Sequence, residues 1–180
     1  MGHRGKKFIH KGVEYDSLEE TYFAMWLDEL KEQAYIRDWK RAADSFQITT
    51  PLINKYAEGK KQKTQTVLQD WSYTPDFVVE WSKYSKGVFY NELGEKIVCP
   101  FIADNEISFV EIKPSFDLHN STRLFKNTQK ALNKTCSIYV NLIKIPNLFK
   151  ETFCPLGFIY TKSGKKRKLK FEMKTINEFF

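Results

Sequence analysis

Residues 73–81 read YTPDFVVEW and residues 109–114 read FVEIKP, and each stretch has the apolar composition of a buried strand. Each also carries charge: Asp76 opens the first apolar run, and Glu111 and Lys113 lie in the second. Residues two apart on a strand point to the same face, so Glu111 and Lys113 share a face while Ile112 points into the core. The sequence therefore predicts a sheet face on which a carboxylate lies beside an ammonium group.

These residue types suit metal-assisted hydrolysis of a phosphodiester. Mg²⁺ prefers oxygen ligands, and Asp76, Glu111 and the backbone carbonyl of Ile112 would supply them. A bound ion lowers the pKa of its water and neutralises the charge that builds up on the phosphate. Lys113 would orient the attacking water or stabilise the transition state. The alternative is structural: a salt bridge between strands at the edge of a sheet.

The segment VEYDSLEETYFAMWLDELKEQAYIRDW, residues 13–39, contains the best helix pattern in the chain. Its apolar side chains recur at helical spacing, and Asp16 or Ser17 can cap the helix. Glu20, three residues after Ser17, makes a capping box available. The sequence therefore predicts an amphipathic helix with acidic residues in its first turn.

The rest of the chain predicts an α/β fold with a mixed sheet. In chain order we expect a strand over 45–53 that ends near Pro51, a surface loop or exposed hairpin over 54–70, one strand over 73–81, a hairpin over 87–102 turning near Leu93–Gly94, and a strand over 107–114. We then expect a helix over 119–134 capped by Asn120 or Ser121, a central strand over 136–145 covered on both faces, and, over 158–180, a hairpin turning at Ser163–Gly164 followed by a terminal segment. No repeat or linker divides the chain, so residues 1–180 predict a single domain.

The pair PDF and EIK resembles the signature of the PD-(D/E)xK, restriction-endonuclease-like nucleases. DSLEE, residues 16–20, is similar to the S-x-x-E helix start of phage endonuclease I-type Holliday junction resolvases and of TnsA-type transposase endonuclease subunits. The resemblance covers about residues 13–145 and implies a restriction-endonuclease-like mixed β-sheet flanked by helices. It also implies a catalytic set that binds Mg²⁺ or Mn²⁺, in which Lys113 assists catalysis and the metal ligands are Glu20, Asp76, Glu111 and Ile112.

The chain departs from this family pattern in three places. The gap from Asp76 to Glu111 is 35 residues (111 − 76), so we expect an inserted hairpin at about 82–106. Pro114 replaces the glycine that is common after the lysine in resolvases and is closer to the TnsA-type strand. Against that second group, the chain has no obvious second DNA-binding domain, and its C-terminal part predicts only a basic hairpin at about 156–172.

The helical acid can be assigned in two ways. The family pattern of serine plus three falls on Glu20, which we favour as the metal ligand. Drawn at 100° per residue, however, Glu19 lies nearer the middle of the apolar face and Glu20 at its edge. The capping box also offers Glu20 a purely structural role, so Glu19 stays the alternative.

Basic residues exceed acidic ones by 29 to 22, which gives a net charge of +7 and suggests a polyanionic partner. Basic runs at 60–63 and 162–170, a third at the N-terminus, and the helix at 119–134 would provide sequence-independent affinity for DNA, whether branched or double-stranded. A charge run can equally be an ordinary solvated face, and Gln129 an ordinary exposed glutamine. The candidate nucleic-acid contacts are Lys60, Lys61, Lys63, Arg123, Lys126, Gln129, Lys165, Lys166, Arg167 and Lys168.

Composition narrows the class of protein further. No apolar run approaches the roughly 20 residues of a spanning helix, and no secretory signal is evident, so a cytoplasmic protein associated with nucleoid or phage DNA is expected. Three separated cysteines predict reduced thiols, and the histidines show no zinc-ligand spacing. The expected activity is a Mg²⁺-dependent endonuclease, of phage or mobile-element type, that acts in recombination, junction resolution, DNA-end processing or transposon-end cutting. Junction resolution would require a homodimer, and transposition or recombination a partner protein; the rivals are a non-catalytic nucleic-acid-binding module and a structural protein.

Overall fold

The computed structural model describes residues 7–41, 44–95, 99–116, 120–161 and 163–180. Within these ranges, the chain forms β1 (Phe8–His10), β2 (Val13–Tyr15), α1 (Leu18–Glu32), β3 (Ile36–Arg41), β4 (Phe46–Thr49), β5 (Leu52–Glu58), β6 (Lys61–Leu68), β7 (Trp71–Tyr73), β8 (Phe77–Trp81), a 3-10 helix (Lys83–Ser85), β9 (Tyr90–Glu92), β10 (Phe101–Ala103), β11 (Ile107–Ile112), α2 (Ser121–Cys136), β12 (Val140–Ile143), α3 (Ile145–Glu151), α4 (Leu156–Ile159) and α5 (Ile176–Phe179).

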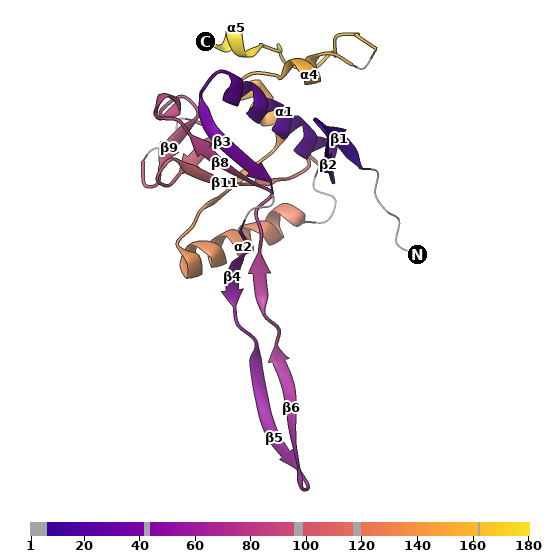
Figure 1. Cartoon of the computed structure of the whole chain (residues 1–180), viewed down its shortest axis with the longest axis vertical. Coiled ribbons are helices and arrows are strands. Elements are labelled where there is room, and N and C mark those ends of the chain that lie inside the picture. The colour runs from indigo at the N-terminus through magenta and orange to yellow at the C-terminus, as the bar shows by residue number, and fades with distance from the viewer. Residues whose placement is uncertain (1–6, 42–43, 96–98, 117–119, 162) are drawn as a thin grey trace.

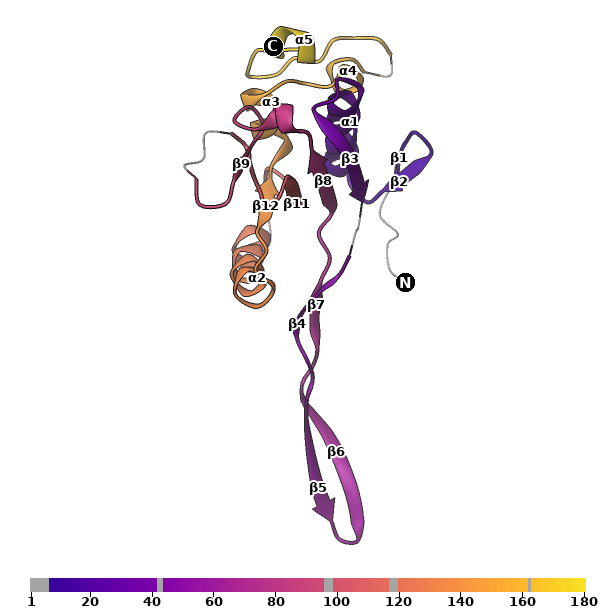
Figure 2. The ribbon, with the colours of Figure 1, turned by 60° about the vertical axis from the view of Figure 1, so that its left-hand side comes forward.

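A four-stranded mixed sheet in the order β12-β11-β8-β3 forms the centre of the molecule (Figures 1 and 2). β8 pairs antiparallel with both β3 and β11, whereas β11 pairs parallel with β12. The predicted α/β class with a mixed sheet is confirmed. β12 lies at the edge of this sheet, so the prediction of a central strand over 136–145 is wrong, although its side chains do enter cores on both faces.

α1 covers one face of the sheet. It begins at Ser17, whose side chain accepts the backbone N–H of Glu20 at 3.1 Å, and this interaction satisfies one free donor of the first turn. The buried stripe of α1 packs against the inward residues of β8 and β11, and the main core therefore joins Phe23, Trp26, Leu27, Leu30, Phe77, Val79, Trp81, Val110 and Ile112. Burial of each large side chain contributes roughly 1.5–3 kcal/mol, so this face anchors the ends of β8 and β11.

α2 covers the opposite face, where Phe125 and Leu132 form a second, smaller core with Val140 of β12 and Ile48 of β4. Phe109 of β11 and Tyr73 of β7 pack against the same core. The helix begins after Asn120, which is one of the two N-cap residues predicted from the sequence. The outward face of β11 and the root of the β4–β7 ribbon are thus held against one helix.

A long antiparallel ribbon projects from the body between β3 and β8 (Figures 1 and 2). Its root is the pair β4–β7, and its distal part is the pair β5–β6, every residue of which is exposed. The exposed-hairpin alternative for residues 54–70 is confirmed. The prediction of one continuous strand over 73–81 is wrong, because the chain leaves the ladder at Thr74–Asp76, where Pro75 cannot donate a ladder hydrogen bond.

Two predicted hairpins form differently. β9 and β10 pair in parallel, so the segment at 82–106 is not a hairpin, although Gly94 does occupy a turn with φ +87°. In the C-terminal segment the expected turn lies at Gly164, but among the described residues of 156–172 a single antiparallel bridge forms, between Tyr160 and Lys166. The short helix α4 occupies the start of this segment. Too few residues therefore remain before the turn for a longer ladder of paired strands.

The cysteines are unpaired in the structure, with Cys99 and Cys154 buried and Cys136 partly buried. Burial raises the pKa of the Cys154 thiol to about 11, which keeps it protonated and unreactive at neutral pH. Within the described ranges, none of the helices has the length and apolar character needed to cross a membrane.

Candidate active site

Asp76 lies between β7 and β8 and bridges to the end of β11. Its Oδ2 accepts the backbone N–H of Ile112 at 2.7 Å, next to the point where Phe77 and Val110 pair across the sheet. Burial raises the pKa of Asp76 to about 7, and the charge of Glu111 acts in the same direction, against the lowering by the Ile112 N–H. A buried acid whose charged form is disfavoured by a second acid is typical of a functional site.

Glu111 and Lys113 share a face of β11, as predicted. The Lys113 ammonium donates to Oε1 of Glu111 at 2.5 Å, while Ile112 is buried in the core on the opposite face. Glu111 is itself only 8 % exposed. The ion pair joins residues of one segment, so it is not the salt bridge between strands that the structural alternative required.

Tyr73 is a site residue that the sequence analysis missed. It ends β7, and its hydroxyl donates to Oε2 of Glu111 at 2.5 Å, so that both oxygens of this carboxylate have a donor. Burial raises the pKa of Tyr73, and the bond to Glu111 raises it further, so the phenol stays protonated. The available signal was its position in YTPDF, three residues before Asp76, where the break at Pro75 brings Tyr73 back toward β11.

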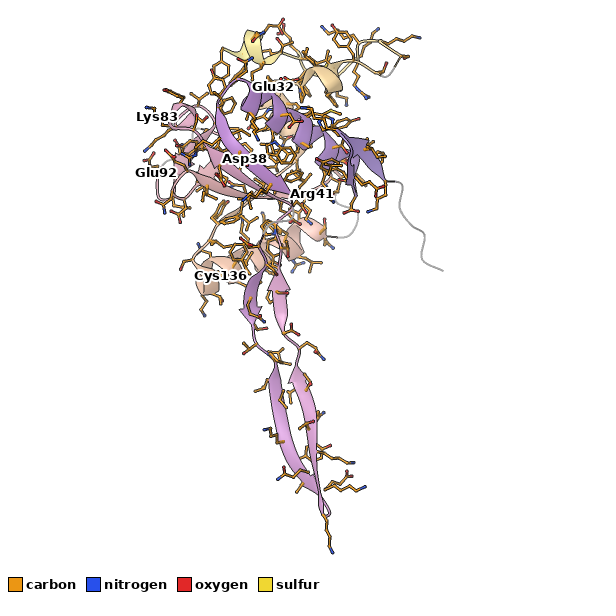
Figure 3. All side chains as sticks on the ribbon, viewed as in Figure 1. Glu32, Asp38, Arg41, Lys83, Glu92 and Cys136 are labelled. Atoms are coloured by element: carbon orange, nitrogen blue, oxygen red, sulfur yellow. The ribbon has the colours of Figure 1, made fainter. Side chains whose placement is uncertain are left out.

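Glu20 lies on the first turn of α1 with two partners. Its Oε1 accepts the Ser17 hydroxyl at 3.0 Å, and its Oε2 lies 3.2 Å from the guanidinium of Arg41, which also pairs with Asp16. Arg41 ends β3 opposite Phe77, where the projecting ribbon leaves the body (Figure 3), and it too was missed from the sequence. The charge of Glu20 raises the pKa of Asp76, which places this helical acid within electrostatic reach of the site.

A cavity of about 370 Å³ connects the helix start to the end of β11. Its lining residues are Ser17, Glu19, Glu20, Ile112, Lys113, Pro114 and Ser121. Asp76 and Glu111 are not among these lining residues. Both helical acids border the cavity, so Glu20 stays the favoured helical acid and Glu19 the alternative.

The carboxylates of this site are suitable ligands for a hard cation, but they are not arranged around a single ion position. Across the part of the chain that the structure describes, no three His, Cys, Asp or Glu side chains gather closely enough to hold one ion. Glu20 and Glu111 are instead held by Arg41 and by Lys113 with Tyr73. Asp76 and Glu111 remain two mostly buried carboxylates whose mutual repulsion a divalent cation would relieve.

The candidate nucleic-acid contacts fall into two groups. Side chains that are exposed and point to solvent are Lys60, Lys61, Lys63, Arg123, Lys126, Lys165, Lys166 and Lys168, although Lys63 also pairs with Glu58. Two others are engaged within the protein. Gln129 donates to the carbonyl of Val140 at 2.6 Å, and Arg167 donates to the carbonyl of Phe158 at 2.8 Å and lies over its ring.

Removing the Tyr73 hydroxyl should destabilise the protein. A hydrogen bond to a charged group contributes about 1.5–3 kcal/mol, and Tyr73→Phe leaves one buried oxygen of Glu111 without this donor, so we expect a loss of about 2 kcal/mol at pH 7.5 in EDTA. Urea unfolding measures the change. Tyr84→Phe is the control because Tyr84 is 67 % exposed. Equal stabilities of the two variants and the wild type would show that the Tyr73–Glu111 bond carries no energy.

The site therefore combines residues from α1, the β7–β8 junction and the end of β11. No protein-family description, curated protein or solved structure matches the chain.

Proposed function

We propose that the chain is a metal-dependent DNA endonuclease of the PD-(D/E)xK type. The observation that carries the proposal is the junction of β8 and β11, where the aspartate of PDF binds the backbone N–H between the glutamate and the lysine of EIK. Motif residues that are 36 positions apart (112 − 76) thus meet with a specific contact. The lysine of the motif forms an ion pair with its glutamate.

In the proposed reaction, Asp76, Glu111 and the carbonyl of Ile112 would hold Mg²⁺ or Mn²⁺, and Glu20 would supply a further acid. A bound ion would supply Lewis-acid polarisation of the phosphate and a water of lowered pKa. Lys113, which donates to Glu111, would orient the attacking water, and its positive charge would stabilise the negative charge that develops on the phosphate. Tyr73 fixes the orientation of the Glu111 carboxylate.

The distribution of charge supports a DNA substrate. Carboxylates would repel a phosphate backbone, and the net charge of +7 offsets that repulsion. Exposed lysines lie on the projecting ribbon, on α2 and on the C-terminal turn. Within this proposal we retain a restriction-endonuclease-like core, an action in junction resolution, DNA-end processing or transposon-end cutting, a homodimer where two cuts are needed, and a location on nucleoid or phage DNA.

The test is a cleavage assay on supercoiled plasmid, linear duplex and four-way-junction DNA, with Mg²⁺ or with EDTA. We expect cleavage only with Mg²⁺, and a loss of roughly 100-fold in Lys113→Ala, the size reported for removal of one group that stabilises transition-state charge. Lys83→Ala is the control, since Lys83 is exposed on the other side of the body (Figure 3). Glu19→Gln and Glu20→Gln, in the same assay, identify the helical acid.

Two results would contradict the proposal. Equal cleavage by the wild type and by Lys113→Ala would remove the site assignment. Tight DNA binding with no cleavage in any divalent cation would favour the non-catalytic nucleic-acid-binding module.

A further inference from the structure

The projecting ribbon, Phe46–Tyr73, hereafter the arm, packs against the body at its root, where β4 lies against α2. β5 and β6 are exposed along their whole length, and Figures 1 and 2 show them extending away from both helical layers. A two-stranded ribbon without a third strand or a helix to cover it is at best marginally stable in water. A ribbon of this kind is therefore expected to gain stability when a binding partner covers it.

The distal part of the arm is made of hydrogen-bonding and basic side chains. Paired positions along it include Asn54 with Gln65, Lys55 with Thr64, and Ala57 with Gln62. The tip carries Lys60, Lys61 and Lys63, against the single acid Glu58, which is paired with Lys63. Amides, hydroxyls and lysines are the groups that contact phosphates and base edges, and a two-stranded ribbon has the width to enter the major groove.

The root of the arm belongs to the candidate active site. β7 ends at Tyr73, whose hydroxyl binds Glu111, and Asp76 follows after Pro75. A strand rises about 3.3 Å per residue, so the twelve steps from Lys61 to Tyr73 (73 − 61) reach roughly 40 Å, the length of about 12 base pairs. A duplex that places a phosphate at the site can therefore continue along the arm for about one helical turn.

We propose that the arm is a DNA-binding β-ribbon that lies in a groove of the duplex flanking the cleavage site and contacts phosphates about one turn away with Lys60, Lys61 and Lys63. This inference rests on the proposed nuclease function, because that function places DNA at the root. It makes duplex DNA with a flank of at least one turn the preferred substrate.

A second copy of the chain is the competing occupant. Apolar side chains near the root are about half exposed, namely Leu52, Ile53, Val67 and Leu68. The charge on the distal part favours DNA over this occupant, since a polyanion neutralises the lysines of the tip, whereas two arms that run side by side in the same direction would bring like-charged tips together. These four apolar side chains are uncharged, so they would not repel a phosphate backbone.

The test compares DNA affinity in EDTA, where binding is measured without cleavage. The arm variant is Lys60→Gln/Lys61→Gln/Lys63→Gln, and the control is Lys83→Gln/Lys150→Gln/Lys174→Gln, which removes the same charge from exposed lysines of the body. On a fluorescent 40-base-pair duplex we expect the arm variant to bind about 50-fold more weakly at 100 mM salt, with a salt slope smaller by about 2 to 3. On a 10-base-pair duplex the two variants should bind alike.

Equal affinities of the arm variant and the control on the long duplex would overturn the inference. So would a wild-type dimer in sedimentation that Leu52→Ser/Leu68→Ser converts to a monomer without any change in DNA affinity, because the arm would then serve a second copy. Failure of the nuclease proposal is distinguishable: the wild type would cut no DNA, while the loss of binding by the arm variant would still support the arm as a DNA contact.

Discussion

Asp76→Asn should abolish Mg²⁺-dependent cleavage. Asp76 is the acid that joins the two halves of the site, and the amide keeps an oxygen that can accept the Ile112 N–H while losing the negative charge needed to hold a cation. A metal ion supplies several kcal/mol of charge stabilisation, and a loss of about 4 kcal/mol corresponds to roughly a 1000-fold lower rate. Initial rates of plasmid nicking with Mg²⁺ measure the effect.

The matched control is Asp104→Asn, since Asp104 is an exposed aspartate on the connection to β11 and keeps its backbone contact with Ile107. Binding of Ca²⁺, followed by calorimetry in the absence of DNA, provides a second readout that does not depend on activity. We expect wild type and Asp104→Asn to bind the ion and Asp76→Asn not to bind it. Unchanged nicking by Asp76→Asn would exclude Asp76 as a metal ligand.

The same substitution should stabilise the metal-free protein at high pH. The folded-state pKa of Asp76 is raised to about 7 from an ordinary value of 3.8, so folding favours the protonated acid. The stability that this group contributes is fully present below about pH 4, declines as the pH rises through 7, and is absent above it. Asn resembles the protonated acid at every pH, so the variant should retain what the wild type loses.

A shift of this size, discounted for partial exposure, corresponds to roughly 2 kcal/mol at pH 8 and to almost nothing at pH 4. Urea unfolding in EDTA at the two pH values measures the difference between variant and wild type, so that contributions common to both proteins cancel. Added Mg²⁺ should then raise the stability of the wild type more than that of the variant. An equal destabilisation by Asp76→Asn at both pH values would show that its charged form is not strained in the fold.

Local patterns in the sequence determined what could be predicted of the fold. The period-2 alternation on β11 placed Glu111 with Lys113 and sent Ile112 to the core, and the Ser17 cap located the start of α1. Apart from the break at Pro75 within residues 73–81, the errors concern pairing between segments. The parallel pairing of β9 with β10 and the edge position of β12 depend on contacts between distant residues, which no short window of sequence contains.

The same distinction applies to the candidate site. The acids were found because charge inside an apolar run is conspicuous, whereas Tyr73 and Arg41 look ordinary in their own segments. Tyr73 reaches Glu111 only because the chain breaks at Pro75, and Arg41 reaches Glu20 only because β3 pairs with β8 beneath the start of α1. The basic residues were ranked by charge alone, so Arg167, which packs on aromatic rings, was grouped with lysines that are free to contact DNA.

The arm leaves the central sheet at Arg41 and returns at Phe77, and these two residues are paired neighbours. The excursion therefore begins and ends at one spot, and lengthening or shortening its outer section alters the closure entropy only with the logarithm of its length. The body keeps its own layers of helix and sheet whatever the reach of that section. A protein built in this way can acquire a different reach by insertion or deletion in the arm, without rebuilding the candidate site at its root.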